Sequence, residues 1–215
     1  MNKANNPMFD AVRQIMEGME LQLPDTSLPD PTMLNYYAFA NERKLFLEED
    51  VGFPIMEMIK MIMRWNQMDK DVPVDQRKPI IIYIMSDGGY MCYMWAMLDA
   101  MLTSKTPIIT VNLGVAASAA SLIFLAGSKR YMMPTANVII HEGSTELAGD
   151  ANKVMDAIKN YNIELAKMKA FILSRTNITP RVMKNKSKDD WYIDAKTCLE
   201  YGVCHKVVES LDEIM

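Results

Sequence analysis

Histidine and cysteine are scarce in this sequence, and their scarcity limits the sites that the chain can build. Its 215 residues include two histidines, His141 and His205, and three cysteines. The cysteines are Cys92, Cys198 and Cys204, and no zinc-binding spacing joins them to either histidine. An odd, small number of cysteines also argues against a disulfide framework. We therefore expect no metal and no cofactor, and we expect the reduced thiols of a cytoplasmic protein.

An excess of positive charge is absent as well. The formal net charge is -4 and the sequence pI is about 5.3, with no run of basic residues. Nucleic-acid-binding proteins usually present a basic surface, so we do not expect a nucleic-acid partner. The first twenty residues carry Lys3, Asp10, Arg13, Glu17 and Glu20, a pattern that does not predict a secretion signal.

A long uncharged stretch runs from Thr106 to Gly127. It is long enough to cross a bilayer, but its pattern predicts a strand, a turn and a helix instead. The β-branched run 108–111 is typical of a buried strand, which Asn112 and Gly114 are expected to end. Small residues at 116–121 then favour a tight turn and the start of a buried helix. We expect no membrane contact.

Strands and helices alternate along the rest of the chain, which predicts one α/β domain around a mostly parallel sheet with right-handed crossovers. Residues 1–40 form an arm with a disordered start, an amphipathic helix at 9–19 and a proline-rich linker. This arm is either a frayed tail or a segment that docks on another subunit. Helix 149–175 is too long for a small domain to cover, so part of it should meet another subunit. The expected strands are 40–47, 79–85, 106–111, 129–131, 137–140 and 207–208, and the expected helices are 54–65, 90–102, 117–125, 149–175, 180–186 and 195–201.

The carboxyl ends of parallel strands meet at one edge of a sheet, where sites gather. Ser118, His141 and the Gly88-Gly89 turn each follow a predicted strand, so we expect them at that edge. A serine nucleophile needs a base within hydrogen-bond reach, and glycine amides can approach an oxyanion closely. Spacing does not select the carboxylate that would complete a triad, although Asp194 is better explained as a helix N-cap. The candidates are Glu142, Asp150, Asp189, Asp190 and Asp194.

From about residue 41 to residue 208, five segments together resemble the proteolytic subunit of the Clp peptidases. The resemblance implies the spiral of βαβ units that this family shares with crotonase-like enzymes, in a peptidase domain at 41–215. It also implies a projecting handle helix within a handle region at about 142–176. The segments are ERKLFL at 42–47, IYIMSDGGY at 82–90, GVAAS at 114–118, PTANVIIHEG at 134–143 and KDDWYIDAKTCLEYGVCHKVV at 188–208.

The resemblance assigns a role to each residue of the site. Ser118 would be the nucleophile, His141 the general base and Asp190 the residue that orients the imidazole. The backbone amides of Gly89 and Ala119 would form the oxyanion hole. The resemblance further implies a homo-oligomer of two stacked heptameric rings, polypeptide substrates, and entry controlled by an ATP-driven unfoldase of the AAA+ class.

Some positions depart from the family pattern and keep other functions open. Asp87 stands where the family has proline, and Glu142-Gly143 replaces its Gln-Pro. These departures favour a divergent member, and they motivate a second hypothesis, a catalytically silent ring subunit. A third hypothesis is a crotonase-like acyl-CoA enzyme, which also uses two backbone amides as an oxyanion hole. The complete set of serine, histidine and aspartate argues against both alternatives.

Overall fold

The computed structural model describes residues 31–143, 148–187 and 189–215. The contacts divide the chain into residues 1–38 and residues 39–215, and the sheet belongs to the second unit. The disordered start and the helix predicted at 9–19 lie outside the described residues. Residues 31–41 are helical, so the strand predicted from Ala40 is wrong at its start, and it begins at Lys44.

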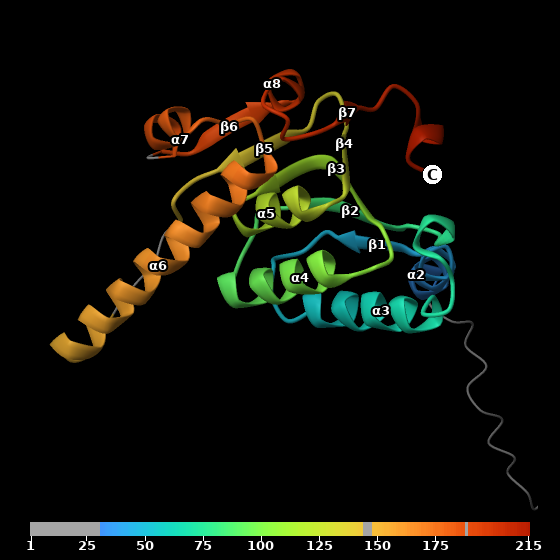
Figure 1. The fold of residues 1–215 in the computed structure, drawn as a ribbon, viewed down its shortest axis with the longest axis horizontal. Coiled ribbons are helices and arrows are strands. Elements are labelled where there is room, and N and C mark those ends of the chain that lie inside the picture. The colour runs from blue at the N-terminus through green and yellow to red at the C-terminus, as the bar shows by residue number, and fades with distance from the viewer. Residues whose placement is uncertain (1–30, 144–147, 188) are drawn as a thin grey trace, which may run out of the picture. The chain divides into compact units, whose positions relative to one another are not determined.

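Helices and strands alternate in the second unit as the sequence predicts (Figure 1). Within the described ranges, no helix is long and apolar enough to span a membrane. The helices are α2 (Pro31–Asn41), α3 (Ile55–Met68), α4 (Met91–Thr103), α5 (Ala119–Ala126), α6 (Ala151–Arg175), α7 (Pro180–Lys186) and α8 (Ala195–Glu200), with 3-10 turns η1 (Val74–Gln76) and η2 (Leu211–Glu213). The strands are β1 (Lys44–Leu47), β2 (Ile80–Ser86), β3 (Ile108–Ala117), β4 (Lys129–Met132), β5 (Asn137–Ile140), β6 (Trp191–Asp194) and β7 (Lys206–Val207).

The sheet is mostly parallel. Its strands follow the order β1-β2-β3-β4-β7, and β5 pairs with the far end of β3. One pair, β5 with β6, is antiparallel. The sequence analysis did not predict β6, although its side chains alternate between buried and exposed as in a strand with one covered face. The predicted α/β class with a mostly parallel sheet is confirmed.

Strand β3 is longer than predicted, and the extension carries the site. The sequence predicts that this strand ends near Asn112, but it continues to Ala117. The Asn112 side chain is fully buried, donates to the carbonyl of Asn137 at 2.9 Å and accepts from the amide of Gly114 at 3.1 Å. These bonds satisfy the buried amide where β3 changes its neighbour from β4 to β5.

The main core lies between the sheet and helices α3, α4 and α5 (Figure 1). Ile80, Ile82 and Ile84 of β2 point into it and are fully buried. The other face of the sheet has a smaller apolar cluster that includes Tyr83 and Ile214. Met85 on β2 is 56% exposed, so this second face of the strand is covered only in part. Helix α6 projects away from the sheet, as predicted for a helix of this length.

An ion pair lies near the amino-terminal ends of β1 and β3. The guanidinium of Arg43, which precedes β1, donates to both carboxylate oxygens of Asp69 at 2.6 Å. Asp69 also accepts from the Thr106 hydroxyl at 2.8 Å. The Arg43 hydrogen bonds hold the pKa of the Asp69 carboxyl below its ordinary value. The side chains are 13% and 7% exposed, so this bidentate pair is largely shielded from water.

Candidate active site

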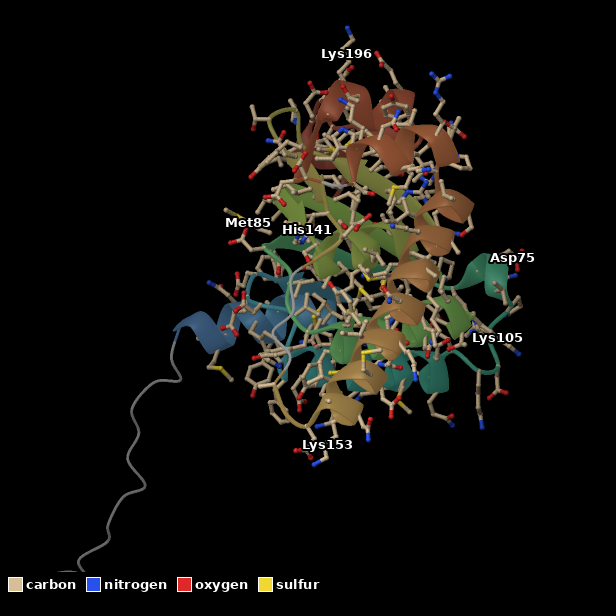
Figure 2. All side chains as sticks on the ribbon, turned by 90° about the vertical axis from the view of Figure 1, so that its left-hand side faces the viewer. Asp75, Met85, Lys105, His141, Lys153 and Lys196 are labelled. Carbon is tan, nitrogen blue, oxygen red and sulfur yellow. The ribbon has the colours of Figure 1, made fainter. Side chains whose placement is uncertain are left out.

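The pairing of β3 with β5 brings Ser118 and His141 to the same edge of the sheet. These strands are parallel, with Ala117 opposite Ile139, and the Ser118 amide donates to the Ile139 carbonyl at 3.0 Å. Ser118 directly follows β3 and His141 directly follows β5. In Figure 2, His141 lies well apart from Lys105, which precedes β3.

Ser118 occupies a strained turn between β3 and α5. Its backbone has φ 50° and ψ -124°, a region that residues with a side chain rarely adopt. The side chain makes no capping hydrogen bond to α5 and is only partly buried. A serine at a strained strand-to-helix turn is typical of an exposed nucleophile, because the turn directs the hydroxyl away from the sheet.

The Gly88-Gly89 turn packs directly against Ser118. A Cβ on Gly88 would lie 2.7 Å from the Ser118 Cβ, and a Cβ on Gly89 would lie 2.6 Å from the Val51 carbonyl. Both residues have positive φ, at 104° and 150°. Only glycine fits this turn without a shift of its neighbours, so the turn sets how closely the β2–α4 connection approaches the serine.

Two backbone amides are suitably placed for an anionic group. Gly89 is held by a bridge to Val51, in which the Val51 amide donates to Gly88 and the Tyr90 amide donates to Val51. Neither bond uses the Gly89 amide. Ala119 is the first residue of α5, where amides have no acceptor within the helix. A helix N-terminus and an adjacent glycine turn together favour negative charge.

The antiparallel pairing of β5 with β6 brings Asp190 to His141. Ile140 is opposite Trp191, so the residue after β5 faces the residue before β6. The His141 Nδ1 atom lies 3.5 Å from a carboxylate oxygen of Asp190. The two side chains are 29% and 57% exposed, so solvent screens this contact in part.

The other candidate carboxylates have different contacts. The Asp194 side chain accepts from the Thr197 amide at 2.7 Å, which confirms its role as the N-cap of α8. Asp150 pairs with Lys153 at 3.2 Å in the first turn of α6. Asp189 is exposed. Asp190, in contrast, lies against the imidazole.

A cavity of about 250 Å³ opens beside Ser118. Ser118, Ala119 and Gly89 line one side of it, and His141 shares the cavity with them. Helix α6 contributes a mostly apolar wall that the sequence analysis did not assign to the site. Its lining residues from α6 are Tyr161 and Met168.

Glu142, the residue after His141, connects the chain that follows β5 to helix α6. Its carboxylate accepts from the Lys169 ammonium at 2.8 Å and from the Ser187 hydroxyl at 3.4 Å. Its backbone carbonyl accepts from the Tyr161 hydroxyl at 2.9 Å. In the sequence, Tyr161, Leu165 and Lys169 recur every four residues and so share one face of the helix, but this spacing does not indicate that the face contacts Glu142.

The site contains no metal cluster in the part of the chain that the structure describes. There, no three histidine, cysteine, aspartate or glutamate side chains gather closely enough to hold an ion. The three cysteines are unpaired: Cys92 is exposed, and Cys198 and Cys204 are buried. The second histidine, His205, has a different contact: its Nδ1 accepts a hydrogen bond from the Arg130 amide at 3.0 Å.

The Clp protease family model matches residues 32–211, which include every residue of the site described above. This chain belongs to the Clp protease family. The resemblance seen in the sequence is thereby confirmed, and the identities below show that the member is divergent.

Clp proteolytic subunits from several bacteria are similar to this chain. The ATP-dependent Clp protease proteolytic subunit 2 of Treponema denticola is 29% identical over 178 residues, or 82% of this chain and 86% of that protein. Subunit 1 of Shouchella clausii is 32% identical over 136 residues, or 62% of this chain and 70% of that protein. The solved structure of a ClpP1 mutant from Listeria monocytogenes matches with a TM-score of 0.72 at 17% identity, covering 84% of this chain and 99% of that one. This structural match shows that the fold is that of ClpP.

Proposed function

We propose that this chain is an active serine peptidase subunit that hydrolyses peptide bonds of unfolded polypeptides. Ser118 is the nucleophile, His141 the general base and Asp190 the residue that orients the imidazole. The amides of Gly89 and Ala119 form the oxyanion hole. The observation that carries the proposal is the pair of strand registers that places Ser118 beside Ile139 and Asp190 opposite His141.

The reaction follows from the orientation of the imidazole. Asp190 faces Nδ1 of His141, which leaves Nε2 to accept the proton of the Ser118 hydroxyl. The serine oxygen attacks the substrate carbonyl, and the developing oxyanion receives hydrogen bonds from the two amides. His141 then donates its proton to the leaving amine, and an acyl-enzyme remains on Ser118. Water, deprotonated by His141, releases the acid product and regenerates the serine.

Two features support polypeptide substrates in an extended form. The cavity beside Ser118 holds about 250 Å³, enough for one or two side chains and too small for a folded domain. Its α6 wall carries Met168 and the ring of Tyr161, which suit an apolar side chain. A substrate therefore reaches the serine as an extended segment of chain. The relatives are named ATP-dependent, and we propose that a separate ATP-driven unfoldase of the AAA+ class delivers substrates in the cytoplasm.

We also propose that the subunit assembles into two stacked heptameric rings. Most of helix α6 is exposed, and it carries large apolar side chains that face solvent. Exposed apolar side chains on a projecting helix favour contact with another copy. They are Met155 at 55%, Ile158 at 40% and Ile163 at 54% exposure.

Hydrolysis by the purified, assembled protein tests the proposal. Short fluorogenic peptides with an apolar residue before the scissile bond should be cleaved, and an unfolded protein such as reduced casein should be degraded. Ser118→Ala should abolish both activities, and His141→Ala should lower kcat by about a thousandfold or more. An assembled wild-type protein that cleaves neither substrate, with or without an unfoldase, would contradict the proposal and favour a silent ring subunit.

A further inference from the structure

The three residues that follow β5 carry the histidine, but they lie outside the sheet. Strand β5 ends at Ile140, so ladder pairing does not extend to His141, Glu142 and Gly143. The side chain of His141 is nevertheless only 29% exposed. Contacts other than the sheet must therefore contribute to its position.

Helix α6 makes two hydrogen bonds to one residue of this segment, Glu142. The Lys169 ammonium donates to the Glu142 carboxylate at 2.8 Å, and the Tyr161 hydroxyl donates to the Glu142 carbonyl at 2.9 Å. Lys169 and Tyr161 are eight residues apart, so they lie on the same face of α6 about two turns apart. One bond fixes the side chain and the other fixes the backbone, so together they restrain both rotation and translation of Glu142.

A small space next to His141 is lined mainly by residues of α6 and α7. His141 and Glu142 share it with Leu165, Met168 and Met183, and it holds only about 10 Å³. Little empty space therefore separates the segment that follows β5 from α6 and α7, so the hydrogen bonds to Glu142 join surfaces that are already packed together.

The ion pair is partly exposed, which sets the size of the expected effect. The Lys169 and Glu142 side chains are 39% and 41% exposed. Pairs of this kind contribute at most about 1 kcal/mol, which corresponds to about a fivefold change in the population of the held state. A larger effect would require the Tyr161 bond to be lost as well.

We propose that Lys169 and Tyr161 are positioning residues, which hold Glu142 so that the adjacent His141 faces Ser118. The inference rests on the proposed function, because it gives these residues a part in the same reaction. Lys169 and Tyr161 touch neither the scissile bond nor the imidazole in this role. They act through Glu142, Lys169 through its carboxylate and Tyr161 through its backbone carbonyl.

Variants at position 169 separate charge from packing. Lys169→Met removes the ammonium and keeps a flexible chain of similar length, whereas Lys169→Arg keeps a cation that can reach one carboxylate oxygen. Lys167→Met is the matched control, because Lys167 pairs at 2.8 Å with Glu164 of the same helix. Each variant is examined in the assembled protein for amide hydrogen exchange of residues 137–143 and for peptide hydrolysis.

The expected results distinguish a positioning role from a general loss of structure. Lys169→Met should speed exchange in residues 137–143 and lower kcat about fivefold, with KM unchanged. Lys169→Arg should restore both quantities to near the wild-type values, and Lys167→Met should change neither. Tyr161→Phe, which removes one hydroxyl, should lower kcat in the same direction, and with Lys169→Met it should lower kcat further.

Two outcomes would overturn the inference. Exchange in residues 137–143 that is the same in Lys169→Met and in the wild type would show that the ion pair does not hold the segment. A fall in kcat that Lys169→Arg fails to rescue would show that the charge is not what matters. A wild-type protein without any hydrolysis would instead refute the proposed function, and the exchange measurement would still decide whether α6 holds the histidine segment.

Discussion

Replacement of Gly88 by alanine should damage both the stability and the reactivity of the site. The new Cβ would lie 2.7 Å from the Ala117 carbonyl oxygen, 2.7 Å from the Ser118 Cβ and 3.0 Å from the Ala119 amide nitrogen. Real Cβ atoms do not tolerate such distances. The neighbours are backbone atoms and the first carbon of a side chain, so none of them can move away without moving the β3–α5 turn.

Two costs combine at this position. The φ of Gly88 is +104°, and a side chain in such a conformation costs about 1–3 kcal/mol. Overpacking of a tight site costs about another 1–3 kcal/mol. The sum of about 2–6 kcal/mol is a large share of the 5–15 kcal/mol that stabilises a typical domain. If the protein relaxes by moving Ser118, a displacement of about 1 Å should slow its reaction about a hundredfold.

Urea unfolding and the rate of Ser118 labelling by a fluorophosphonate measure the two effects. Gly114→Ala is a matched control, because its Cβ would meet only the flexible Met85 side chain, at an ordinary contact distance of 3.8 Å. Gly114→Ala should change the free energy of unfolding by less than about 1 kcal/mol. The reasoning would be refuted if Gly88→Ala unfolded at the same urea concentration as Gly114→Ala and reacted at the wild-type rate.

Three further predictions concern other parts of the structure. Asp69→Asn should destabilise the fold by about 3 kcal/mol, because it leaves Arg43 without its counter-charge in a shielded position. The pKa of the Asp69 carboxyl is lowered in the folded state, so the wild type should lose this stability as the pH falls below about 4 and through the folded-state pKa. Urea unfolding of Asp69→Asn should lack this part of the pH dependence. Asp190→Asn should lower kcat about a hundredfold with little change in stability, because the Asp190 carboxylate orients His141 but is 57% exposed; an unchanged kcat would contradict its role. A thiol reagent should modify only Cys92 in the native protein and all three cysteines in urea, because Cys198 and Cys204 are buried. Modification of Cys198 or Cys204 in the native protein, identified by mass spectrometry, would contradict this prediction.

The sequence predicts the edge of the sheet at which the site lies better than it predicts the contacts within the site. Ser118 and His141 each follow an apolar run, and parallel strands end at a common edge, so their approach could be predicted. The end of β3 could not be predicted, because Asn112 is polar and its burial depends in part on the carbonyl of Asn137, 25 residues away.

The choice of the carboxylate required a long-range pairing. Five acidic residues lie near His141 or β6 in the sequence, and their spacing from His141 does not select one of them. The antiparallel register of β5 and β6 decides which of them faces the imidazole, and this register depends on contacts between segments about fifty residues apart. The bond between Lys169 and Glu142 was missed for the same reason, since i to i+4 periodicity shows a shared helix face but not what that face meets.

The most direct test of the proposed function is the site of reaction with a fluorophosphonate probe. The assembled wild-type protein is treated with the probe and digested, and mass spectrometry identifies the modified residue, with Ser118→Ala and His141→Ala as controls. The account predicts one modification, at Ser118, which is absent in Ser118→Ala and strongly slowed in His141→Ala. Modification of another serine, or labelling of Ser118 at an equal rate without the histidine, would contradict a nucleophile activated by His141.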